Sequence, residues 1–118
     1  IRKGESLCYL SYPKFIMQMQ SMYRDENKSP FDEASKVADF KGVLLIDDFG
    51  ADKLTDFVRQ MSYFLINQRE QHCLPLIITS NFSLNELKQQ IDDKIASRIS
   101  GICKTYEIRG EDKRISKA

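Results

Sequence analysis

Apolar positions along this chain follow two periods, and together they predict an α/β fold. Four short runs are apolar or alternate in the manner of β-strands, at residues 6–11, 43–47, 76–79 and 102–108. Between these runs apolar residues recur at helical spacing, over residues 13–23, 31–40, 55–71 and 92–100. Strands that alternate with helices predict a parallel sheet joined by right-handed crossovers. We therefore expect a three-layer architecture, a parallel sheet with helices on both faces.

Polar and special residues mark where several of these helices begin and end. Pro13 suits the first turn of a helix, and Thr55 suits the N-cap position of the long one. Ser83 and Glu86 have the three-residue spacing of a capping box and predict a further short helix. Gly101 is expected to end the helix over residues 92–100. The apolar side of the first helix is expected in the core, through Phe15, Ile16, Met19, Met22 and Tyr23.

The segment GVLLIDDFG, residues 42–50, is the most informative one for function. Its apolar stretch has no polar alternation, which is typical of a strand buried on both faces of a parallel sheet. Asp47 and Asp48 follow at the carboxyl end of that strand, the edge where open α/β sheets bind ligands. Two carboxylates there need a cation, hydrogen bonds or a substrate to stabilise them. The pattern is that of a Walker B motif, and the alternative is a plain strand end with two solvated aspartates.

Two further residues are candidates for the same chemistry. Asn81 follows the next strand and can hold a water or contact a terminal phosphate, or it can simply cap a turn. Arg98 lies on the helix predicted over residues 92–100 and can reach phosphate in a neighbouring subunit, where it would stabilise transition-state charge. The alternative for Arg98 is a surface ion pair with Asp92 or Glu86, worth under about 1 kcal/mol.

In this order and at these intervals, LLIDD, ITSN and the helix that contains SRI resemble AAA+ ATPases. Within that superfamily the chain is similar to the DnaC/DnaI-type loaders of replicative helicases and to the IstB-type transposition helper ATPases. The resemblance runs from the strand at 6–11 to the closing strand and the turn at 107–111. It implies a cytoplasmic, ATP-dependent DNA replication accessory protein with a replicative helicase as its partner, or alternatively an IstB-like helper.

The resemblance also implies roles for individual residues. By that analogy Asp47 supports Mg²⁺ bound to ATP, and Asp48 takes the role of the catalytic carboxylate. Asn81 matches the sensor 1 position. Arg98 matches the arginine that acts in trans on a neighbouring subunit, which implies self-association. Many AAA+ proteins have Glu at the second acidic position, whereas the resembling family commonly has Asp-Asp.

The phosphate-binding loop of such ATPases is not found in the sequence. That loop needs the pattern G-x-x-x-x-G-K-[ST], and none of the five glycines begins it. Residues 1–4 are expected to be the end of the helix that follows this loop in a longer protein. Residues 1–118 are thus expected to be a partial AAA+ domain that, without the loop, binds ATP and Mg²⁺ weakly or not at all.

Loaders of this kind engage single-stranded DNA, and residues 14–36 hold the candidate contacts. Lys14, Arg24, Lys28 and Lys36 can meet backbone phosphates, and Tyr12 or Tyr23 can stack on a base. Eighteen basic residues against seventeen acidic ones give a net charge of +1, which neither requires nor excludes nucleic acid. The alternative is an ordinary mixed surface, because acidic residues interrupt the basic ones: Asp25, Glu26, Asp32 and Glu33.

Two alternative hypotheses come from other classes of protein. A receiver domain also has an acidic pair after an apolar strand. In a receiver that pair follows the first strand, and a later strand ends in the phosphorylated Asp. In this sequence a strand precedes the pair, and no later predicted strand ends in Asp. The second alternative is a non-catalytic interaction module that keeps the ATPase shape.

The three cysteines lack CxxC spacing and are expected to be reduced, and a single histidine makes a zinc site improbable. No apolar run approaches the length of a membrane span.

Overall fold

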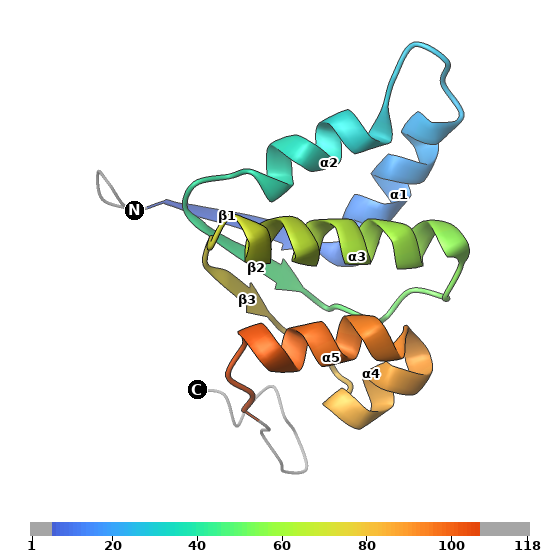
Figure 1. Cartoon of the computed structure of the whole chain (residues 1–118). Coiled ribbons are helices and arrows are strands. Elements are labelled where there is room, and N and C mark those ends of the chain that lie inside the picture. The colour runs from blue at the N-terminus through green and yellow to red at the C-terminus, as the bar shows by residue number, and fades with distance from the viewer. Residues whose placement is uncertain (1–5, 107–118) are drawn as a thin grey trace.

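The computed structural model describes residues 6–106, which form a parallel three-stranded sheet and five helices (Figure 1). The elements follow one another as β1 (Leu7–Ser11), α1 (Tyr12–Tyr23), α2 (Pro30–Ala38), β2 (Val43–Asp47), α3 (Asp56–Gln71), β3 (Leu76–Ile78), α4 (Leu84–Gln90) and α5 (Asp93–Ile102). Each strand is followed by at least one helix before the next strand begins, so the predicted parallel α/β class is confirmed.

The central strand of the sheet is β2, which pairs in parallel with β1 on one side and with β3 on the other. Its Leu44 and Ile46 are fully buried and belong to the core that the helices complete. The register places Tyr9, Leu45 and Ile77 in one row on the opposite face. Tyr9 and Ile77 are 58% and 51% exposed, so within residues 6–106 no helical layer covers this face.

The predicted helix starts are confirmed by their hydrogen bonds. The Thr55 hydroxyl accepts a bond from the Val58 N–H at 3.2 Å and begins α3. Ser83 and Glu86 exchange the two reciprocal bonds of a capping box at the start of α4, 2.8 and 3.2 Å long. Pro13 occupies the first turn of α1. Local sequence therefore determines where these three helices begin.

The core side of α1 agrees with the prediction except at its two tyrosines. Tyr23 is 69% exposed and packs only its ring against Phe57, with centroids 5.5 Å apart, so its place in the core was predicted wrongly. Tyr12 is fully buried, and its hydroxyl is hydrogen-bonded to that of Ser62 at 2.6 Å, so it cannot stack on a base. Burial raises the pKa of Tyr12. The remaining predicted residues are buried or packed against the core, namely Phe15, Ile16, Met19 and Met22.

The predicted end of the chain's last helix and the predicted fourth strand are wrong within the described residues. Gly101 lies inside α5, which continues to Ile102, and residues 103–106 form no strand. A helical glycine costs only about 1 kcal/mol, whereas Ile102 gains contact with the core by staying helical. The rest of that strand, the turn at 107–111 and the helix end expected at 1–4 lie outside the residues described.

A buried arginine joins three segments of the fold. Arg69 of α3 has no exposed surface. Its guanidinium donates hydrogen bonds to four backbone carbonyls, those of Ala38, Phe40, Gly42 and Pro75. These carbonyls belong to the end of α2, the approach to β2 and the residue before β3. Arg69 therefore fixes where the two strands enter the sheet.

Candidate functional site

The acidic pair lies at the carboxyl edge of the sheet, in a tight reversal of the chain. Asp47 is the last residue of β2, and Asp48 follows with a φ of +63°. Gly50 has a φ of +92°, and a Cβ there would meet the Leu87 side chain at 2.8 Å. Positive φ is uncommon for residues other than glycine, although Asp and Asn adopt it more readily than most. The backbone thus adopts an unusual conformation where the sequence predicts chemistry.

Both oxygens of the Asp47 carboxylate accept hydrogen bonds. The Tyr9 hydroxyl of β1 donates to Oδ2 at 2.7 Å, and the Thr79 hydroxyl, just past β3, donates to Oδ1. The bond to Asp47 raises the pKa of Tyr9. The Asp48 N–H donates to the same Thr79 hydroxyl at 3.1 Å. Residues of β1 and of the segment just past β3 therefore converge on the acidic pair at the end of β2.

A third carboxylate, Asp52, lies four residues beyond the pair and was not expected at the site. One of its oxygens is buried and has no hydrogen-bond partner among the described residues. Burial raises the pKa of Asp52, and the charge of Asp48 raises it further. The charge of Asp48 therefore adds to the effect of burial in favouring the neutral form of Asp52.

Thr79, rather than Asn81, is the residue that joins the end of β3 to the acidic turn. Asn81 is exposed in the loop that precedes α4, and no hydrogen bond links its side chain to another described residue. Ser80 donates a bond from its hydroxyl to the Phe49 carbonyl at 2.6 Å. Sequence reasoning missed Thr79, although it is the first polar residue after an apolar strand that neighbours the acidic strand.

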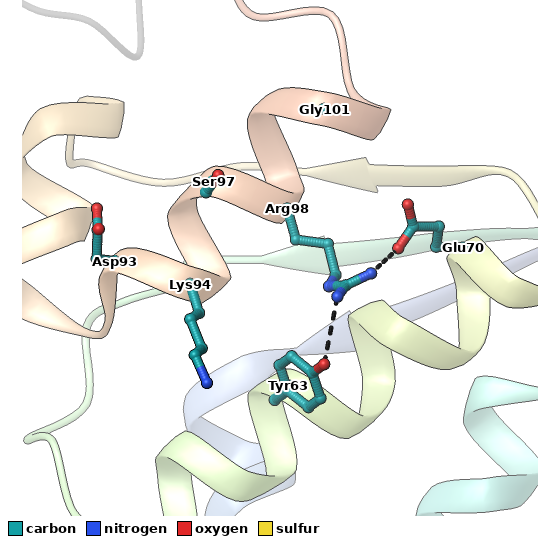
Figure 2. A pocket seen from close by; sticks show the side chains of 7 residues that line it. All are labelled: Tyr63, Glu70, Asp93, Lys94, Ser97, Arg98 and Gly101. Carbon is teal, nitrogen blue, oxygen red and sulfur yellow. Dashed lines mark hydrogen bonds and ion pairs between the residues drawn. The ribbon is translucent and has the colours of Figure 1, made fainter.

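Arg98 is held against α3 and is not brought to the acidic pair (Figure 2). It forms an ion pair with Glu70, which raises the pKa of Arg98, and donates a bond to the Tyr63 hydroxyl at 3.2 Å. Its guanidinium also lies 5.2 Å from the centroid of the Tyr63 ring. The alternative expectation of a pair with Asp92 is wrong, because Asp92 pairs with Arg59 at 3.2 Å.

The surroundings of Arg98 form an open hollow between α3 and α5. Glu86, the second ion-pair partner expected for Arg98, instead forms the capping box of α4 with Ser83. The side chains of Arg98 and Glu70 are 32% and 37% exposed, so solvent screens their attraction. The hollow is lined by Tyr63, Glu70, Asp93, Lys94, Ser97, Arg98 and Gly101 (Figure 2).

Three of the four basic residues predicted to meet DNA are exposed at and beyond α1, and the fourth, Lys36 of α2, pairs with Glu33 at 2.9 Å. Lys14 lies in the first turn of the helix, Arg24 is its C-cap residue, and Lys28 follows in the next loop. Arg24 follows Lys14 by ten positions along the helix, a rise of about 15 Å. None of the three forms an ion pair with another residue of the part described. Their charges are therefore available to a ligand.

The donor set at the acidic turn fits a magnesium ion only when the ion brings its own phosphate ligands. Residues 6–106 contain no group of three His, Cys, Asp or Glu side chains arranged to hold a metal. Mg²⁺ is usually bound by one or two carboxylates together with substrate phosphates and waters, and Asp47 and Asp48 supply such oxygens.

None of the described helices is both long enough and apolar enough to cross a membrane.

The fold and the acidic turn define a parallel α/β protein with the architecture of the DnaC/DnaI-type helicase loaders. The solved DnaC helicase loader matches 86% of this chain and 60% of its own chain with a TM-score of 0.72 and 24% identity. A putative primosome component from Streptococcus pyogenes serotype M3 matches 92% of this chain and 55% of its own, with a TM-score of 0.70 and 24% identity. These two likenesses show the fold alone.

A sequence relative carries the resemblance further. The replicative helicase loader DnaI of Bacillus subtilis (strain 168) is 27% identical over 107 residues, or 90% of this chain. The matched region is only 29% of DnaI. A solved DnaI structure has a TM-score of 0.69 at 19% identity over 85% of this chain and 54% of its own. No family model matches the chain. The predicted resemblance to DnaC/DnaI-type helicase loaders is confirmed by these comparisons.

Proposed function

We propose that this chain is the Walker B-containing part of an ATP-hydrolysing loader that delivers a replicative helicase to single-stranded DNA in the cytoplasm. The observation that carries the proposal is the acidic pair at the carboxyl edge of the sheet, where Asp47 is held by donors from both flanking segments. The similarity to DnaI supports a loader over a transposition helper. Because the chain spans less than a third of DnaI, the activity belongs to the full-length protein.

The residues of the site divide the chemistry among them. Asp47 would hold Mg²⁺, which when bound neutralises charge on the phosphates of ATP. Asp48 would orient the attacking water and accept its proton, because its carboxylate receives no hydrogen bond from another described residue. Asn81 would hold that water or contact the terminal phosphate. Arg98 would leave Glu70 to reach the nucleotide of a neighbouring subunit, at little cost because their ion pair is partly exposed.

The test is ATP turnover by the full-length protein with Mg²⁺, measured with and without single-stranded DNA and the host's replicative helicase. We expect turnover that responds to DNA and requires Mg²⁺. A full-length protein that neither binds nor hydrolyses ATP would contradict the proposal and would leave the non-catalytic interaction module as the better account.

The exposed basic residues of α1 and its following loop are expected to bind DNA phosphates. Joint replacement of Lys14, Arg24 and Lys28 by alanine should weaken affinity for single-stranded DNA by about an order of magnitude and lower the salt dependence by about two units of slope. Fluorescence anisotropy with a labelled oligonucleotide at several salt concentrations measures both. The matched control is Lys36→Ala, since Lys36 already pairs with Glu33 at 2.9 Å. Equal affinity in the triple variant and the wild type would exclude this face.

Arg98 is expected to act on the active site of a neighbouring subunit. Arg98→Ala should lower turnover by about 10³-fold, as loss of an arginine finger does. Because its action is in trans, mixing Arg98→Ala with inactive Asp48→Asn subunits should restore part of the turnover. Arg59→Ala, which removes a different paired arginine, is the control. Full turnover by Arg98→Ala alone, or no recovery in the mixture, would exclude the role in trans.

A further inference from the structure

One residue joins the end of β3 to the acidic turn at several atoms. The Thr79 N–H donates to the Ile46 carbonyl at 2.9 Å, and the Thr79 carbonyl accepts from the Phe49 N–H at 2.8 Å. Its hydroxyl accepts from the Asp48 N–H at 3.1 Å and donates to Asp47. Four consecutive residues, 46–49, are therefore hydrogen-bonded to Thr79.

The Thr79 hydroxyl oxygen acts as a donor in one of its two hydrogen bonds and as an acceptor in the other. A hydroxyl has one proton to donate and two lone pairs that accept. The proton goes to Asp47, and a lone pair takes the N–H of Asp48, so the orientation of the first carboxylate is tied to the backbone of the second. A bond to an ionised carboxylate is stronger than one between neutral groups. Serine can reproduce both bonds, whereas valine has nearly the same shape and can reproduce neither.

A second donor reaches the same carboxylate from the opposite side of β2. Tyr9 is 58% exposed on the uncovered face of the sheet, yet its hydroxyl lies 2.7 Å from Asp47 Oδ2. With Thr79 on Oδ1, each oxygen of Asp47 has its own donor, one from each neighbouring strand. A carboxylate restrained at both oxygens has a fixed plane, which determines where its remaining lone pairs point.

We propose that Thr79 and Tyr9 are positioning residues that orient Asp47 toward a metal–nucleotide complex, and that Thr79 also holds the backbone of Asp48. The inference rests on the proposed ATPase function. Residues that orient a metal ligand typically change metal affinity or activity by about 10- to 100-fold when their bonds are removed. Neither residue needs to touch ATP for this effect, because each acts through Asp47.

The experiment compares Thr79→Val, Thr79→Ser and Tyr9→Phe with wild type in the full-length protein. Two quantities are measured: ATP turnover with Mg²⁺, and affinity for the Mn²⁺–ATP complex by electron paramagnetic resonance. We expect Thr79→Val to lose about 10- to 100-fold in kcat or in metal–nucleotide affinity, Thr79→Ser to recover most of this loss, and Tyr9→Phe to lose several-fold. Thr55→Val removes a comparable hydroxyl bond at the N-cap of α3 and serves as the matched control.

The outcomes separate this inference from the proposed function. If the wild type hydrolyses ATP, and both Thr79→Val and Tyr9→Phe keep its turnover and its Mn²⁺–ATP affinity, the positioning role alone is overturned. Absence of both binding and turnover in wild type would overturn the function and this inference with it. If Thr79→Val does not fold, the exposed Tyr9→Phe still decides, because its loss of metal–nucleotide affinity supports the role and wild-type affinity contradicts it.

Discussion

Asp48→Asn is expected to lower ATP turnover of the full-length protein by about 10²- to 10⁴-fold, the range typical for loss of a general base. Asparagine has the same size but cannot accept the proton of the attacking water. Asn adopts positive φ as readily as Asp, so the turn at φ +63° and the bond from its N–H to Thr79 should survive. Steady-state kinetics, together with ATP binding by fluorescence, separates lost catalysis from lost binding.

The control for this experiment is Asp56→Asn, the same substitution at an exposed carboxylate in the first turn of α3. It should alter turnover by no more than a few-fold, because Asp56 is exposed and forms a surface pair with Arg59. If Asp48→Asn retained wild-type kcat while Asp56→Asn behaved as expected, Asp48 would not be the catalytic carboxylate.

The second large effect is expected on stability. Arg69→Met should lower the free energy of unfolding by about 3–5 kcal/mol, because it removes several hydrogen bonds from a charged donor, each worth about 1.5–3 kcal/mol. Methionine fills much of the space but removes the donor from the carbonyls of Ala38 and Gly42, whereas the Pro75 carbonyl keeps its bond from the Leu44 N–H at 3.1 Å. Since whole domains are stable by about 5–15 kcal/mol, this loss is a large share of the total. Urea unfolding followed by circular dichroism measures it.

Arg59→Met provides the matched comparison on the same helix. The Arg59 side chain is 41% exposed and pairs with Asp56 and Asp92, so its replacement should change the free energy of unfolding by under about 1 kcal/mol. Equal losses in the two variants would mean that the carbonyl bonds of Arg69 contribute no more than a surface ion pair.

The sequence predicts much of this fold because local signals agree with the tertiary structure. The strand at 43–47, the Thr55 cap and the capping box at Ser83 each form where expected, although only one face of the strand is buried. The wrong predictions concern positions decided by distant contacts. Gly101 stays helical because Ile102 packs on the core, and Tyr12 is buried because Ser62 satisfies its hydroxyl. Neither contact is visible in a local pattern.

In the candidate site, too, the residues marked by a local sequence pattern were predicted, whereas the contacts between residues distant in the chain were not. The acidic pair is recognisable because both carboxylates follow one apolar strand. Thr79 was missed because its role depends on the alignment of β3 beside β2, which the sequence does not specify to the residue. Arg98 was identified by its place on the helix, but its partner Glu70 lies 28 positions away in the chain. No periodicity within one helix predicts such a pair.

The left-handed backbone at the second acidic residue also restricts which acid can stand there. A φ of +63° is tolerated by Asp, whose short side chain can satisfy nearby backbone groups, better than by Glu. A shorter side chain has a shorter reach, so under the proposed function a water activated by Asp48 would lie closer to the turn than one served by a glutamate. The choice of Asp over Glu can thus be understood as a steric requirement of the turn, with the position of the water adjusted to match.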